Sequence, residues 1–148
     1  MAPIVHHLGM ATDAAALAKK TKLSAAARPV VLDGGPGGLS DALTTAVDRP
    51  VADRLTGAHD WILMFAADRA SLESQLPDVA TALETPGTLW VAYPKGSSKR
   101  QTDLTRDKGW DSITSHDLMW LSLISIDDDW SAFSLRHYRP GEARQTFR

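Results

Sequence analysis

Two runs of consecutive apolar residues constrain the fold of this chain most strongly. Residues 60–67 (DWILMFAA) and 88–93 (TLWVAY) are apolar at successive positions, without a regular polar alternation. Such runs are typical of strands buried on both faces of a parallel sheet. Between them, apolar residues recur at helical spacing after Asp68, a candidate helix cap. The pattern predicts a strand–helix–strand unit with a right-handed crossover, in which Pro77 kinks or restarts the helix and Pro86-Gly87 ends it.

A second unit of the same kind precedes the first. Residues 29–33 (PVVLD) predict a strand, the glycine-rich turn GGPGG follows at 34–38, and residues 39–47 predict a helix with Ser40 or Asp41 as its N-cap. Residues 50–55 predict a short second strand. Upstream, the alanine-rich segment 12–22 predicts a short helix that Thr12 or Asp13 can cap.

The C-terminal third predicts a hairpin. Residues 119–126 and 130–138 are expected to form two strands around the acid triplet 127–129, and the second alternates with period two, as an antiparallel edge hairpin does. Before the hairpin, Thr102 and Asp103 are expected to cap a helix that runs toward Thr114. The acid triplet itself predicts a solvated turn, because adjacent residues of a hairpin point in alternating directions and rarely chelate one ion.

Composition limits the classes of function. With 148 residues, 43% of them hydrophobic, the chain predicts one domain over 11–140, a loose arm at 1–10 and a basic tail at 141–148. The absence of cysteine excludes disulfides, thiolate metal sites and cysteine nucleophiles, and the histidines have no metal-ligand spacing. The apolar runs are too short to span a membrane and there is no secretory signal, which predicts a cytoplasmic protein without membrane contact. The net charge of −2 makes a nucleic-acid partner a poor fit, although bases cluster between 94 and 108.

The glycine turn carries a first resemblance. The run VVLDGGPGG resembles the first motif of class I S-adenosylmethionine-dependent methyltransferases, and Asp33, Gly35 and Gly37 match its register, while Leu39 stands where a further glycine is usual. The resemblance implies a second acid near the end of the next strand that binds ribose hydroxyls, and Asp53 is the candidate. Only six residues separate Asp53 from Asp60, which leaves no room for the next strand and helix that would wall an adenine pocket. The turn is therefore interpreted either as a relict or as a working cofactor site.

The central stretch carries a second resemblance. WVAYPK at 90–95 with TDLTRD at 102–107, supported by Trp130-Ser131, resembles an uncharacterised bacterial family of small Rossmann-like proteins, a domain of unknown function. The resemblance covers about residues 59–138 and implies a methyltransferase-like sheet without an established activity; the segment 108–118 departs from it.

The loop after residue 94 is the other candidate site. Lys95 leaves a buried strand and is predicted to bind an anion or a partner together with Ser97, Ser98, Thr102 and Asp103. In the alternative interpretation, Thr102 and Asp103 only cap a helix and Lys95 only covers the end of the sheet.

Together these patterns predict a three-layer α/β domain, Rossmann-like and methyltransferase-like, with a mostly parallel sheet and an antiparallel C-terminal hairpin. Two functions follow. The first is a non-enzymatic binding or regulatory protein on a degenerate methyltransferase-like frame, without a cofactor, whose partner is a protein or a small anionic ligand. The second is an enzyme that binds a nucleotide or S-adenosylmethionine in a minimal pocket at the turn of residues 34–38. The edge of the hairpin is also a candidate surface for pairing with a second copy in a homodimer.

Overall fold

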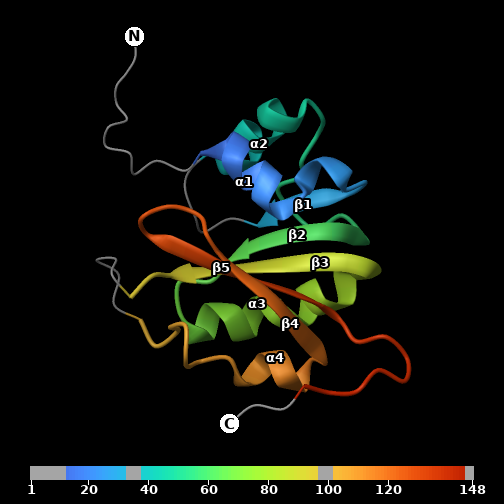
Figure 1. Cartoon of the computed structure of the whole chain (residues 1–148), viewed down its shortest axis with the longest axis vertical. Helices are drawn as coiled ribbons and strands as arrows, with labels where there is room; N and C mark the ends of the chain where they lie inside the picture. Colours follow the sequence, from blue (N-terminus) through green and yellow to red (C-terminus); the bar gives the residue numbers. More distant parts are fainter. Residues whose placement is uncertain (1–12, 33–37, 97–101, 146–148) are drawn as a thin grey trace.

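The computed structural model describes residues 13–32, 38–96 and 102–145 of the chain (Figure 1). The predicted arm at 1–10 and the end of the predicted tail lie outside these residues. In chain order the elements are α1 (Ala14–Thr21), the 3-10 turn η1 (Leu23–Ala25), β1 (Pro29–Leu32), α2 (Leu39–Val47), β2 (His59–Phe65), α3 (Arg69–Ala82), β3 (Leu83–Pro94), α4 (Asp111–Ser115), β4 (Leu118–Ser125) and β5 (Trp130–His137).

The strands form a five-stranded sheet in the order β1-β2-β3-β5-β4. The pairs β1–β2 and β2–β3 are parallel, and β5 is antiparallel to both β3 and β4. Because β4 reverses the direction of β5, β5 alone opposes the other strands. The predicted α/β class, the mostly parallel sheet and the antiparallel hairpin are confirmed, with β5 inside the sheet and β4 at its edge.

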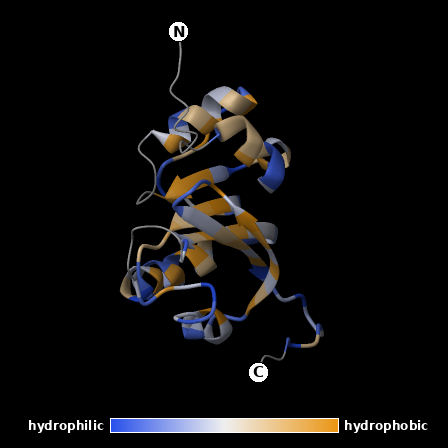
Figure 2. Cartoon of the chain, turned by 60° about the vertical axis from the view of Figure 1, so that its left-hand side comes forward, coloured by the Kyte–Doolittle hydropathy of each residue, from blue (hydrophilic) through white to orange (hydrophobic). Residues whose placement is uncertain are grey.

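Helices cover both faces of the sheet, which makes three layers. Side chains of α1 and α2 pack on one face, and those of α3 and α4 on the other (Figure 1). Strand β2 supplies both cores: Trp61, Leu63 and Phe65 enter the first, while Ile62 and Met64 enter the second. This division explains why the strand is apolar at successive positions, and Figure 2 shows hydrophobic strands between more polar helix surfaces.

The caps of the first two helices differ from each other. Asp13 caps α1, where its Oδ1 accepts a hydrogen bond from the Ala16 N–H at 3.0 Å. The N-cap of α2 is Gly38, with φ of +74°, and the prediction of Ser40 or Asp41 is wrong. The helix spans 39–47 as predicted, and Leu39 and Leu43 are buried in the first core; its cap therefore lies two residues before Ser40.

Helix α3 is capped as predicted and continues through its proline. Asp68 Oδ1 accepts a hydrogen bond from the Ser71 N–H at 2.8 Å. The expected restart at Pro77 is wrong: one helix runs to Ala82 with Pro77 inside it. Leu76 and Val79 are buried on either side of the proline, and this packing holds the helix together where one backbone hydrogen bond is lost.

Strand β3 begins before Pro86-Gly87 instead of after it. Leu83 already pairs with His59, and the register shifts before Thr88 pairs with Trp61. Gly87 permits this course of the backbone, because a Cβ there would lie 2.6 Å from the Glu84 carbonyl oxygen of β3 itself and 3.3 Å from the Asp60 Cα of β2. The prediction that these two residues separate helix from strand is therefore wrong.

Two further predicted elements are reduced in the structure. The strand predicted at 50–55 is a single parallel bridge between Ala52 and Val30, with Val31 N–H donating to the Ala52 oxygen at 2.8 Å. The helix predicted from Thr102 is wrong over most of its length, because Thr105 and Lys108 pair in a tight turn and only α4 is helical. Within the described ranges, no helix combines the length and the apolar content needed to cross a membrane.

Candidate functional site at the carboxyl edge of the sheet

The parallel strands bring several predicted site residues to one edge of the sheet. Strands β1, β2 and β3 end there at Leu32, Phe65 and Pro94. In open α/β sheets, ligands bind in the crevice beyond such carboxyl ends. Asp33, Gly35 and Gly37 follow β1 in the sequence but lie outside the described residues, as do Ser97 and Ser98.

Asp53 lies beside β1, and the parallel bridge between Ala52 and Val30 sets it about level with Val31, before the end of that strand at Leu32. It directly follows Ala52, whose backbone pairs with β1 in parallel. Its carboxylate is 72% exposed, and its ion-pair contact is with the neighbouring Arg54 at 3.6 Å. The resemblance to methyltransferases implied an acid at the end of the next strand. In the structure that strand is a single bridge, and the cofactor-binding role of Asp53 stays a prediction.

The N-terminus of α2 directly follows the glycine-rich turn in the sequence. Gly38 occupies the N-cap, and no described side chain forms a capping hydrogen bond. The first backbone N–H groups of a helix have no partner within the helix and carry the positive end of its dipole. This end of α2 therefore suits an anionic or strongly polar ligand group.

Lys95 joins β3 to the hairpin. Its Nζ donates a hydrogen bond to Ser125 Oγ at 2.7 Å, and its backbone N–H donates to the Asp129 oxygen at 2.8 Å. In the hairpin turn, Asp127 Oδ1 accepts hydrogen bonds from the N–H groups of Asp129 and Trp130. The prediction that the acid triplet forms a turn is confirmed, and Lys95 has a structural role in holding that turn to the sheet.

Asp103 caps a helix, but a different one from that predicted. Its Oδ1 accepts a hydrogen bond from the Arg69 N–H at 2.8 Å, at the first residue of α3. Thr102 Oγ1 accepts one from the Leu104 N–H at 3.2 Å, which forms a local turn. The Asp103 contact holds the segment that begins at Thr102 to the start of α3.

A pocket of about 650 Å³ begins beside this edge at Arg69. Its walls are aromatic: Phe133 meets Trp110 edge to face at 5.3 Å and Trp120 at 4.7 Å between ring centroids. Tyr93 stacks behind Phe133 at 5.4 Å. Burial raises the pKa of the Tyr93 phenol, against the opposing effects of Arg106 and of a hydrogen bond with Ser131.

Charged side chains form the rim of this aromatic pocket. Arg69 pairs with Glu73 at 2.8 Å and with Asp111 at 3.4 Å, and Arg106 pairs with Asp107 at 3.2 Å. Sequence reasoning missed the pocket, because Trp110 falls in the segment that departs from the resembled family and Phe133 reads as one position of an alternating strand. Among the residues that the structure describes, no group of three or more histidines and acids is placed to hold a metal ion.

No family model matches the chain, and no curated protein does. Solved structures do match. The mitomycin 7-O-methyltransferase MmcR matches over 84% of this chain and 53% of its own, with 13% identity and a TM-score of 0.63. An S-adenosylmethionine-dependent methyltransferase from Clostridium acetobutylicum matches over 84% and 90%, with 8% identity and a TM-score of 0.56.

The glycopeptide N-methyltransferase MtfA, complexed with sinefungin, matches over 87% of this chain and 88% of its own, with 10% identity and a TM-score of 0.55. The chain spans about half the length of MmcR and nearly all of the other two. At these identities the likeness concerns architecture. The chain has a Rossmann-like fold that is similar to the fold of these S-adenosylmethionine-dependent methyltransferases.

Proposed function

We propose that the protein binds S-adenosylmethionine at the carboxyl edge of its sheet and is a minimal methyltransferase. The observation that carries the proposal is the position of Asp53, which follows a parallel bridge next to β1, the strand that leads into the glycine-rich turn in the sequence. The fold likeness supports it, because the matching solved structures include S-adenosylmethionine-dependent methyltransferases. We therefore prefer this function to that of a non-enzymatic binding or regulatory protein.

The described residues fit the polar parts of this cofactor. The exposed carboxylate of Asp53 has room to accept hydrogen bonds from the ribose hydroxyls. The N-terminus of α2 suits the carboxylate of the methionine part, because its first N–H groups have no side-chain cap in the described residues. Asp33, Gly35 and Gly37 are proposed to complete the site. When bound, the cofactor supplies an activated methyl group.

The aromatic pocket supports a place for the methyl acceptor. It starts at Arg69, the residue that opens α3 directly after the carboxyl end of β2, and it is walled by Trp110, Trp120 and Phe133. Aromatic walls with a charged rim favour a planar, polar small molecule. We assign the acceptor to this pocket.

A second candidate function is ligand binding without methyl transfer. It is favoured by the single Ala52 bridge outside β1, because within the described ranges no further strand stands beyond that bridge. The adenine ring of a cofactor bound there would be covered on one side by only a short segment of the described chain. Under this proposal, the protein senses or sequesters the cofactor. The predicted anion or partner site at Lys95, Thr102 and Asp103 then passes the change caused by cofactor binding to a partner molecule.

Titration calorimetry with S-adenosylmethionine, its demethylated product and ATP tests the binding. We expect saturable binding of the first two. Gly35→Val is expected to abolish it, and Asp53→Asn to weaken it about fivefold through loss of a charged acceptor, which is about 1 kcal/mol. Asp48→Asn is the matched control, since Asp48 is an exposed acid after α2 with φ of +56°, a conformation that asparagine also adopts.

No heat of binding at millimolar cofactor would contradict the proposal. Equal weakening by Asp53→Asn and Asp48→Asn would also contradict it, because the effect would then reflect net charge alone. Binding without transfer to any of a panel of planar phenols and amines would favour the second candidate.

A further inference from the structure

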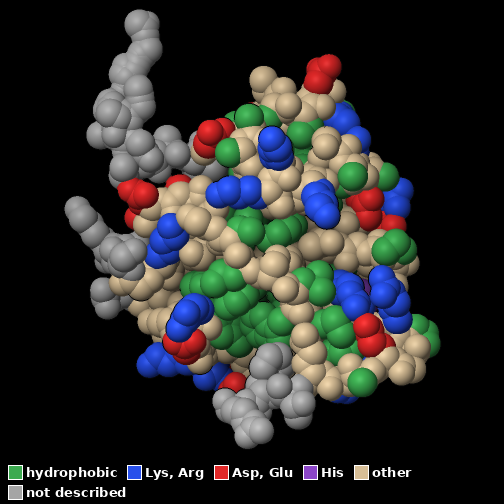
Figure 3. All heavy atoms as spheres, in the orientation of Figure 1, with side chains coloured by type: hydrophobic (Ala, Val, Ile, Leu, Met, Phe, Trp, Pro, Cys, Tyr) green, Lys and Arg blue, Asp and Glu red, His purple; other side chains and the backbone are tan. Residues whose placement is uncertain are grey.

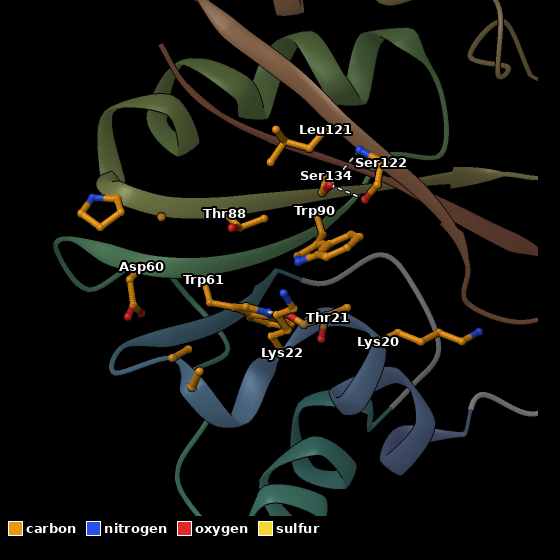
Figure 4. A pocket seen from close by; sticks show the side chains of 14 residues that line it. Lys20, Thr21, Lys22, Asp60, Trp61, Thr88, Trp90, Leu121, Ser122 and Ser134 are labelled. Carbon is orange, nitrogen blue, oxygen red and sulfur yellow. Dashed lines mark hydrogen bonds between the residues drawn. The ribbon is translucent and has the colours of Figure 1, made fainter. Parts of the chain in front are cut away.

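A second pocket, of about 430 Å³, lies over the amino-terminal halves of β2 and β3, away from the carboxyl edge. It lies between the end of α1 and the edge strand β4 (Figure 4). The side chains that define it are Lys22, Trp61, Thr88, Trp90, Leu121 and Ser122. On the face seen in Figure 3, hydrophobic side chains gather in the middle, with lysine and arginine side chains around them.

The indole N–H of Trp90 has no hydrogen-bond partner among the described residues. Trp90 is 5% exposed, and its Nε1 is buried. The neighbouring Trp61, in contrast, donates its indole N–H to the Thr21 oxygen at 3.1 Å. A buried donor without an acceptor is destabilising and uncommon in folded proteins. In Figure 4 the Trp90 ring projects from β3 toward α1, so the unpaired donor lies in the wall of the pocket.

A β-bulge shapes the opposite wall. Trp120 pairs with Leu135 and Ser122 pairs with Ser134, so Leu121 is an extra residue without a partner in β5. A bulge re-aims side chains, and here both Leu121 and Ser122 line the pocket although they are adjacent in sequence. Leu121 is 48% exposed, and the Ser122 hydroxyl pairs with that of Ser134 at 2.7 Å. The wall is therefore apolar with a satisfied hydroxyl pair beside it.

The charges at the rim favour an anion. Lys20 and Lys22 line the pocket, and Lys20 Nζ reaches the Ser125 oxygen at 3.0 Å. The acid in the lining, Asp60, accepts hydrogen bonds from two backbone N–H groups at 2.8 Å each. Burial alone would raise the pKa of Asp60, but these donors outweigh it and lower the pKa. The lining thus contains two lysines, of which Lys20 binds the Ser125 oxygen, and one carboxylate whose two oxygens each accept a hydrogen bond.

We propose that this pocket binds a small planar organic anion. Its ring lies against the indoles and Leu121, one of its oxygens accepts the hydrogen bond from Trp90 Nε1, and Lys22 balances its charge. Stacking on indole favours a planar ring, and the unpaired donor requires an acceptor. The proposal is independent of S-adenosylmethionine, because it concerns the other half of the sheet.

The test is a titration with 2-naphthoate followed by the indole signals in a ¹H–¹⁵N spectrum. The chain has five tryptophans, and Trp90→Phe identifies the signal of Trp90. We expect that signal to move saturably, and binding to Trp90→Phe to be about fivefold weaker through loss of the hydrogen bond. Lys22→Gln is expected to weaken binding about two- to fivefold. Lys19→Gln, on the same helix but outside the pocket, is the matched control and should leave binding unchanged.

A Trp90 signal that stays in place at millimolar naphthoate would overturn the proposal. Movement confined to Trp110 or Trp120 would do the same, because the anion would then occupy the aromatic pocket. Equal effects of Lys22→Gln and Lys19→Gln would show attraction by net charge only. If Trp90→Phe fails to fold, the wild-type signals and the lysine pair still decide. Failure here would leave cofactor binding at the carboxyl edge unaffected.

Discussion

Replacement of Asp103 by alanine should loosen the start of α3. The Asp103 carboxylate accepts the Arg69 N–H at 2.8 Å, while Asp68 accepts the Ser71 N–H. The helix therefore has two capping acids, one local and one 34 residues away in sequence. Asp103→Ala removes the distant one and leaves the first N–H of the helix to water.

The size of the effect follows from the exposure of this contact. Loss of a capping side chain costs about 0.5–2 kcal/mol, and the carboxylate also stabilises the positive end of the helix dipole by about 0.3–1 kcal/mol. Because the Arg69 N–H is accessible to water once uncapped, we expect a total near 1–2 kcal/mol. In a domain of this size that lowers the melting temperature by about 2–8 °C.

Urea unfolding measures the free energy directly. Asp103→Asn keeps an oxygen acceptor and loses only the charge, so we expect it to cost less than half as much as Asp103→Ala. Asp107→Ala is the matched control, because that side chain is 78% exposed and pairs only with the adjacent Arg106; it should stay within about 0.5 kcal/mol of the wild type.

Equal stability of Asp103→Ala and Asp107→Ala would refute this reasoning. The carboxylate of Asp103 would then have no capping role, and the anion-binding role predicted from the sequence would become its better explanation.

Two other perturbations have defined outcomes. Gly109→Ala places a Cβ 2.7 Å from the Asp103 oxygen at a φ of +98°, so we expect a loss of about 1–3 kcal/mol in urea unfolding. Gly96→Ala, with open space around it, should have little effect, and similar losses for both would contradict the steric explanation. Hydrogen bonds from Arg136 lower the pKa of Glu142 from its ordinary value of 4.5 to about 2. The stability that this pair adds is therefore present above pH 4.5 and lost as the pH falls from 4.5 to about 2. A carboxyl ¹³C titration of Glu142 with a midpoint near 4.5 would show that the pair does not form in solution.

The strands of the sheet were predictable because a strand that is buried on both faces has apolar residues at successive positions. Every position from Trp61 to Phe65 packs in one core or the other, so the run is apolar throughout. The hairpin was predictable from its alternation and its acidic turn. The extension of β3 back to Leu83 was not, because it depends on the close approach of Gly87 to β2.

The caps show the limit of local patterns. Asp68 and Asp13 cap the helices that directly follow them, and spacing alone indicates this. Asp103 has the same local signature, a polar pair before a helix-compatible segment, but its partner is Arg69, which no short-range rule connects to it. The site shows the same limit: Asp53 follows from a motif, while both pockets depend on the packing of strands distant in sequence.

The bulge in β4 is a further feature that local sequence patterns do not predict. Residues 119–126 predict a strand, but not that Leu121 lacks a partner in β5. Because of that one inserted residue, Leu121 and Ser122 both line the same pocket. The sequence periodicity of the strand does not indicate the bulge.

The most direct test of cofactor binding at the carboxyl edge is to map S-adenosylmethionine onto the chain by backbone ¹H–¹⁵N shifts. The account predicts saturable shifts at the first amides of α2, from Leu39 to Asp41, and at Asp53, with the Trp90 indole signal unchanged. Shifts centred on Trp61 and Trp90, or no shifts at millimolar cofactor, would contradict it.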